Sequence, residues 1–173
     1  MNLQNEEFEP VWAAGFMSGT SIDAVDAALI LTDGVDVLDF GPVAEQKYAP
    51  DEREILKQAV AAAREWNWQG APPERVFNDA KNVLTSTHGA AWEMLMSEWS
   101  GPSPVIAGVH GQTVLHRAPG RGMKGETLQL VDAGALRRQL DIPLAFDFRS
   151  HDVSEGGNGA PLAPAYHAAL LRR

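Results

Sequence analysis

The amino-acid sequence predicts an α/β fold in which helices flank a mixed β-sheet. Three short apolar segments joined by tight turns open the chain, and such a series is typical of an antiparallel meander. Two long segments with apolar residues at helical spacing follow, and the rest of the chain alternates strand-like and helical segments. A generic α/β sandwich is the alternative architecture.

Composition limits the classes of protein to which the chain can belong. Its 173 residues suffice for one sizeable core or for most of one lobe of a larger protein. The formal net charge of −9, without a basic stripe, argues against a nucleic-acid or anionic-membrane partner. No apolar run approaches the ~20 residues of a membrane span, and the absence of cysteine excludes disulfides. We therefore expect a cytoplasmic protein.

The first half of the chain carries the meander and the two long helices. Residues 1–10 are acidic and polar, and we expect a flexible N-terminus there. The residues 32–34 form a turn signal between two of the strands. Apolar runs, alternation and helical spacing predict, in order, strands at 12–18, 25–31 and 35–43, a helix over 50–63 and a helix over 73–95.

The second half of the chain alternates strands and helices. Glycine-rich loops are expected at 117–125 and 152–160, and the polar residues 110–113 follow directly after a buried strand. The patterns predict, in order, a strand at 105–109, a strand at 127–131, a helix at 133–140, a strand at 142–148 and a helix at 162–171.

A turn rich in glycine, serine and threonine separates the first two predicted strands. Gly19 lets the backbone approach a ligand closely because it lacks a Cβ, and consecutive turn N–H groups can bind an anion. Asp23 and Asp26 would repel a phosphate but attract its Mg²⁺, often through water. The segment therefore suggests a hairpin that binds phosphate and magnesium, with an ordinary solvated turn as the alternative.

Two polar clusters follow predicted strands, where open α/β sheets place their ligands. His110, Gln112 and Thr113 offer hydrogen-bonding groups that suit a sugar, although His110 could instead bond to the backbone. Arg149 can hold a carboxylate through two parallel hydrogen bonds, although an internal ion pair with Asp147 would serve to hold the loop. Both clusters are candidate substrate contacts.

Three blocks, in this order, resemble the anhydro-N-acetylmuramic acid kinase family. They are MSGTSID at 17–23, HGQT at 110–113, and DFR at 147–149 with GGNGAPL at 156–162. The resemblance covers residues 13–173 and about half of a usual family member. It implies that residues 11–173 form the first lobe of an actin-like, ribonuclease-H-like ATPase fold. Such kinases add water across the anhydro bond of the sugar and phosphorylate its 6-hydroxyl during peptidoglycan recycling.

The resemblance also implies an ATP- and magnesium-binding hairpin. Asp23 is the expected partner of Mg²⁺, through water, and Asp26 is the alternative. Alanine stands at position 24, and valine at position 131, where the family usually has glycine. The residues that match the ATP-binding segment are Gly19, Thr20, Ser21, Ile22, Asp23, Ala24, Val25 and Asp26.

The second and third blocks are implied to contact the anhydro amino sugar. Arg149 would face the lactyl carboxylate of that sugar, and the remaining side chains would bind its hydroxyl and acetamido groups. The implied substrate-binding residues are His110, Gln112, Thr113, Asp147 and Arg149.

No catalytic residue is assigned to this chain. In the family, an aspartate that acts as general base lies in a block similar to GFDxGPGN, which is not found in this sequence. We therefore expect a lobe that is inactive alone and that works with a second-lobe chain or as a homodimer. The alternative is a non-catalytic amino-sugar-binding lobe or a truncated relic.

Overall fold

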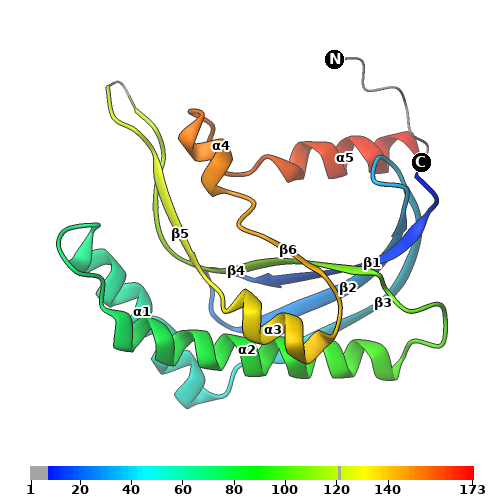
Figure 1. Cartoon of the computed structure of the whole chain (residues 1–173), viewed down its shortest axis with the longest axis horizontal. Helices are drawn as coiled ribbons and strands as arrows, with labels where there is room; N and C mark the ends of the chain where they lie inside the picture. The colour runs from blue at the N-terminus through cyan, green and yellow to red at the C-terminus, as the bar shows by residue number, and fades with distance from the viewer. Residues whose placement is uncertain (1–7, 121) are drawn as a thin grey trace.

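The structure is a computed structural model that describes residues 8–120 and 122–173. Within these residues, six strands form one mixed sheet with helices on both faces (Figure 1), and this confirms the predicted α/β class. The strand order is β3-β2-β1-β4-β5, and β6 pairs with β4. The prediction for residues 1–10 falls mostly outside the described residues. The strands are β1 (Val11–Ser18), β2 (Ala24–Thr32), β3 (Val37–Lys47), β4 (Ile106–Arg117), β5 (Glu126–Leu130) and β6 (Leu144–Phe146).

Two long helices lie on one face of the sheet and two shorter ones on the other (Figure 1). Phe16 and Leu29 of the sheet pack with Leu56 and Leu84 of the long helices in one buried core. Among the described residues, no helix has the length and apolar character needed to cross a membrane. The helices are α1 (Pro50–Trp66), α2 (Glu74–Ser97), α3 (Ala133–Leu140), α4 (Ser150–Ser154) and α5 (Leu162–Arg172).

The antiparallel meander of the first three strands is confirmed, but the third strand is displaced along the sequence. β1 pairs with β2 and β2 with β3, yet β3 covers Val37–Lys47 where residues 35–43 were predicted. Asp33 explains the late start, because its Oδ1 accepts the backbone N–H groups of Asp36 (2.8 Å) and Val35 (2.9 Å). These bonds hold residues 33–36 in a turn, and they keep the pKa of Asp33 below its usual 3.8.

The strand predicted at 105–109 was too short, because β4 continues through the polar residues to Arg117. Gly111 allows this continuation by adopting a left-handed φ of +71°, and a Cβ there would lie 2.6 Å from the carbonyl oxygen of Leu130. The parallel pairing of β4 with β1 is irregular at this point. Before it, Val109 is buried, and after it Gln112 is buried, so the bulge shifts the inward-facing residues by one position.

The strand predicted at 142–148 was too long, because β6 covers only Leu144–Phe146. Asp147 ends it with a left-handed φ of +57°, which is incompatible with an extended strand. The chain then forms the short helix α4 at Ser150–Ser154, partly within the segment predicted as a loop at 152–160.

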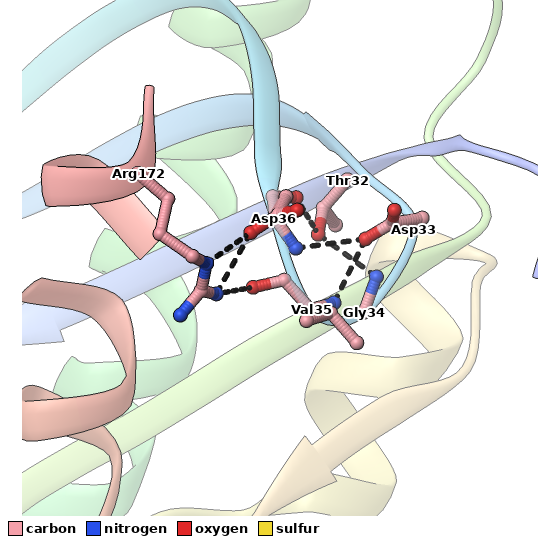
Figure 2. A network of polar contacts seen from close by, with 6 residues as sticks. All are labelled: Thr32, Asp33, Gly34, Val35, Asp36 and Arg172. Atoms are coloured by element: carbon pink, nitrogen blue, oxygen red, sulfur yellow. Dashed lines mark hydrogen bonds and ion pairs between the residues drawn. The ribbon is translucent and has the colours of Figure 1, made fainter. Parts of the chain in front are cut away.

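A polar network joins the end of α5 to the turn between β2 and β3 (Figure 2). Arg172 donates from Nε to Asp36 Oδ1 (2.8 Å) and from Nη2 to the carbonyl of Val35 (3.0 Å). Thr32 closes the same turn, since its hydroxyl donates to the carbonyl of Asp36 (2.7 Å) and accepts from the N–H of Gly34 (2.9 Å). The turn therefore holds α5 over the face of the sheet that α1 and α2 leave open.

His88 of α2 lies in the core with 1% of its surface exposed. Its Nδ1 contacts the carbonyl of Leu84 at 2.7 Å, and its Nε2 has no hydrogen-bond partner among the described residues. Burial lowers the pKa of His88 to about 4, from an ordinary value of 6.5. The folded chain therefore holds a neutral histidine at this position.

We predict that this histidine makes the fold sensitive to mild acid. The unfolded chain takes up its proton near pH 6.5 and the folded chain near pH 4, so stability is lost as the pH falls between these values. The loss amounts to about 3 kcal/mol at 1.36 kcal/mol per pKa unit. In urea titrations from pH 7 to pH 4, the free energy of unfolding should depend less on pH in His88→Leu than in the wild type. The exposed control His151→Leu should keep the pH dependence of the wild type. Equal pH dependence in both variants would contradict the assignment.

Candidate functional site

The turn between β1 and β2 presents a charged carboxylate to solvent. The N–H of Ile22 donates to the carbonyl of Gly19 (3.1 Å) and closes the turn. Asp23 Oδ1 accepts from the hydroxyl of Ser21 (2.6 Å) and from the N–H of Ala24 (3.1 Å). These hydrogen bonds hold the pKa of the exposed Asp23 carboxyl below 3.8, and the bond from Ser21 has the largest effect. Asp23 is therefore ionised at neutral pH, as a partner of Mg²⁺ must be.

Ile22 and Ala24 are the two unusual residues of the turn: Ile22 for its backbone conformation, and Ala24 because the family usually has glycine there. Ile22 adopts a left-handed φ of +53°, which costs a β-branched residue about 1–2 kcal/mol. Its side chain is 5% exposed and belongs to the core, which offsets that cost. Ala24 stands outside the left-handed region, so the alanine found in place of the usual glycine fits the turn without strain.

Buried residues hold both ends of this turn. Ser18 Oγ donates to Gln112 Oε1 (2.6 Å) and also contacts the hydroxyl of Tyr48 (2.7 Å). Gln112 Nε2 donates to the carbonyl of Gly19 (3.2 Å), and the backbone N–H of Tyr48 donates to the carbonyl of Asp23 (3.0 Å). Burial raises the pKa of Tyr48 to about 12, so its hydroxyl stays protonated.

Asp26 lies apart from the turn, on β2. It pairs in register with Met17 of β1 and Glu45 of β3, and it lines a cavity of about 760 Å³. Phe148 and Tyr166 line the same cavity, which lies between the open face of the sheet and α5. The structure thus separates the two aspartates that the sequence left as alternatives, with Asp23 in the turn and Asp26 on the sheet.

A second polar cluster forms where β4, β5 and the segment after β6 meet. Thr113 Oγ1 accepts from Arg149 Nη1 (3.2 Å) and from Gln129 Nε2 (3.4 Å), and Gln129 also donates to Thr127 Oγ1 (2.7 Å). Arg149 Nε and Gln129 Oε1 are buried without a hydrogen-bond partner in the described part of the chain. This cluster therefore holds one donor and one acceptor that are buried and have no partner in the described part of the chain.

Gln129 was missed by the sequence analysis. It alternates with Thr127 along the predicted strand, which shows only that the two side chains share a face. Its approach to Thr113 depends on the register of β4 against β5, where these two residues are directly opposed.

The glycine-rich loop closes over Arg149. The N–H of Gly159 donates to Asp152 Oδ2 (2.6 Å), and a Cβ at position 159 would lie 3.1 Å from Arg149 Nε and 3.4 Å from His116 Cε1. Burial lowers the pKa of His116 below 6.5, and the nearby charge of Arg149 lowers it further. His116 therefore favours its neutral form beside the guanidinium.

The two remaining predicted residues lie beside this cluster in the sequence but have other partners. His110 is half-buried, and its Nδ1 contacts the carbonyl of Gly111 at 2.8 Å, which leaves Nε2 as an acceptor in the neutral ring. Asp147 is exposed and accepts from the hydroxyl of Ser150, whereas Arg149 donates to Thr113. The internal Asp147–Arg149 ion pair, considered as an alternative, is not formed between these described residues.

The donor set near the turn fits Mg²⁺ held mainly by a nucleotide. Across residues 8–120 and 122–173, no three histidine or acidic side chains gather in a way that would hold a metal ion. Mg²⁺ commonly takes one or two carboxylates together with substrate phosphates and waters, and the exposed carboxylate of Asp23 matches that arrangement.

The fold defines an α/β domain in which helices flank a mixed sheet and a serine- and threonine-containing turn follows the first strand, as a sugar-kinase- or ATPase-like fold requires. The chain belongs to the anhydro-N-acetylmuramic acid kinase family, whose family model matches residues 12–173.

Curated relatives in several bacteria carry the name of this family. The anhydro-N-acetylmuramic acid kinase of Brucella anthropi is 46% identical over 168 residues, covering 95% of this chain and 45% of the relative. The kinase of Rhizobium rhizogenes is 46% identical over 167 residues, again covering 95% of this chain and 45% of the relative. That of Caulobacter vibrioides is 46% identical over 162 residues, covering 91% of this chain and 43% of the relative. The chain spans less than half the length of these relatives.

We predict that Gly159 must remain glycine for the loop to close over Arg149. In Gly159→Ala, the methyl group would add a clash to the cost of a left-handed φ (+77°), for a total of about 2–4 kcal/mol. Gly156→Ala is the matched control, because Gly156 also has a left-handed φ (+94°) but no atom within 4 Å of its Cβ position. Urea midpoints should fall further for Gly159→Ala, and equal losses would show that the loop does not pack against Val153 Cγ2 and Arg149 Nε, which lie 2.9 Å and 3.1 Å from the Cβ position.

Proposed function

We propose that this chain is the nucleotide- and sugar-contacting lobe of a kinase that opens 1,6-anhydro-N-acetylmuramic acid with water and phosphorylates it to N-acetylmuramic acid 6-phosphate. The observation that carries this proposal is the parallel pairing of β1 with β4, in which Ser18 is in register with Gln112. That pairing brings the turn at residues 19–23 next to the strand that carries His110 and Thr113, which supports one site for phosphates and sugar. Because the reaction consumes ATP, we place it in the cytoplasm.

The turn is proposed to bind the phosphates of ATP. The proposed segment is residues 19–26, in which the turn offers the hydroxyls of Thr20 and Ser21 and those N–H groups that it does not use itself, and Asp23 would hold Mg²⁺ through water. The bound Mg²⁺ would neutralise charge that develops on the transferred phosphoryl group. The position of Asp23 in the turn favours it over Asp26, which lies on β2 and lines the apolar cavity.

The sugar is proposed to lie against the second cluster. The guanidinium of Arg149, which donates from Nη1 to Thr113, has further donors that support binding of the lactyl carboxylate. His110, Thr113 and Asp147 would contact the hydroxyl and acetamido groups. Gln112, the remaining residue that the sequence predicted to contact the sugar, has a fully buried side chain, and both ends of its amide are engaged within the protein.

The general base is proposed to be an aspartate outside these 173 residues. Kinases of this kind close two lobes over ATP and sugar, so that only the reacting water has access. This lobe alone would position its ligands without completing the reaction, and the second lobe would come from the same polypeptide, from another chain or from a homodimer partner.

We predict that Asp23→Asn weakens binding of magnesium-ATP by about tenfold, since a charge-assisted hydrogen bond contributes about 1.5–3 kcal/mol. Isothermal titration of the protein at its natural length, with and without Mg²⁺, measures this effect. Asp26→Asn is the matched control and should leave affinity unchanged. Weakening by Asp26→Asn alone would transfer the role to Asp26, and unchanged affinity in both variants would contradict the phosphate turn.

We predict that Arg149 distinguishes sugars with a carboxylate from those without one. Arg149→Lys replaces a two-pronged donor by a point charge, and it should weaken binding of 1,6-anhydro-N-acetylmuramic acid about tenfold. The matched ligand 1,6-anhydro-N-acetylglucosamine lacks the lactyl group, so its affinity should stay the same in the wild type and the variant. Equal losses for both sugars would show that Arg149 holds the loop and not the carboxylate.

A further inference from the structure

The buried contacts around Ser18 form a chain of hydrogen bonds with one possible direction. Ser18 has a single hydroxyl proton, and it donates this proton to the amide oxygen of Gln112, which can only accept (2.6 Å). In the 2.7 Å contact between Ser18 and Tyr48, the tyrosine must therefore be the donor. The neutral state of the Tyr48 hydroxyl, whose pKa burial raises to about 12, agrees with this role.

The orientation of the Gln112 amide is likewise fixed by its partners. Its Nε2 donates to the carbonyl of Gly19, which also accepts the N–H of Ile22. If the amide were reversed, its oxygen would face the carbonyl of Gly19 and two acceptors would repel each other. The Gln112 amide therefore forms hydrogen bonds with both Ser18, the last residue of β1, and Gly19, the first residue of the turn.

The bulge at Gly111 is what brings this amide into the core. Side chains of a regular strand alternate between faces, so Val109 and residue 111 would share the buried face and residue 112 would point away. The irregular step between the pairs Phe16–Val109 and Ser18–Gln112 moves Gln112 to the buried face instead, where it has 0% exposure. Thr113 then faces Arg149 on the opposite side.

We propose that Gln112 is a positioning residue for the nucleotide turn, which it holds through Ser18 and Gly19 while Tyr48 holds the far end at Asp23. This inference rests on the proposed function of the turn. It makes one segment of β4 responsible for both ligands: Thr113 belongs to the sugar cluster, and the adjacent Gln112 sets the geometry of the turn that receives the phosphates.

The test compares variants of this chain of bonds with a buried hydroxyl elsewhere. Gln112→Glu keeps the shape of the side chain but replaces the donor opposite Gly19 by an acceptor, and Ser18→Ala removes the central hydroxyl. Thr87→Val is the matched control, because the Thr87 hydroxyl is buried on α2 and donates to the carbonyl of Val83 (2.9 Å), away from the turn. Amide hydrogen exchange and steady-state kinetics are measured on the protein at its natural length.

Gln112→Glu and Ser18→Ala should raise the exchange rate of the 19–23 amides and the KM for ATP by about tenfold each, as expected when a buried polar group loses its partner. The KM for the anhydro sugar should not change, and Thr87→Val should change neither quantity. A raised KM for the sugar with an unchanged KM for ATP would overturn the proposal and make Gln112 a direct sugar contact.

Three further outcomes are informative. If the 19–23 amides of folded Gln112→Glu and Ser18→Ala exchange as slowly as those of the wild type, the proposal is also overturned. If Gln112→Glu does not fold, the test uses Ser18→Ala and the milder Tyr48→Phe. Each of these variants removes a single hydroxyl group from the chain of hydrogen bonds. A wild type that lacks kinase activity even with its second lobe present would refute the proposed function, whereas the exchange measurement would still decide whether Gln112 holds the turn.

Discussion

The hydrogen bonds of the buried Gln112 amide are the contacts on which the arrangement of the candidate site depends. They join β4 to the turn after β1, and these two segments are 93 positions apart in the sequence. An amide that is fully buried must have its partners, because an unpaired buried donor or acceptor costs about 1–3 kcal/mol. The turn is therefore held at a defined distance from the strand that carries His110 and Thr113, before any ligand binds.

This constraint explains why the three family blocks occur in one small region of the fold. The first block is the turn, the second is the bulged part of β4, and the third follows β6, which pairs with β4. Arg149 of the third block reaches Thr113 of the second, and Gln112 of the second reaches Gly19 of the first. The proposed binding surface, made of three segments distant in the sequence, thus depends on the pairing of β4 with its neighbours.

Much of the fold could be predicted because local patterns agree with it. The meander and both long helices follow from apolar periodicity, and Asp33 and Gly34 marked the turn that precedes β3. The errors lie where polar residues continue or interrupt a strand: His110 and Gln112 suggested an end to β4, whereas Gly111 permits a bulge and continuation. The partnership of Gln129 with Thr113 could not be predicted, because it depends on strand register, which no local pattern specifies.

The central claim is that this lobe belongs to a kinase that opens and phosphorylates an anhydro amino sugar. The most direct test incubates the protein at its natural length, together with any separate chain that supplies its second lobe, with 1,6-anhydro-N-acetylmuramic acid, ATP and Mg²⁺, and identifies the product by mass spectrometry. The account predicts a sugar that has gained one water and one phosphoryl group on its 6-hydroxyl, together with ADP. Binding of the sugar without any turnover would contradict it and would favour a lobe that only binds amino sugars.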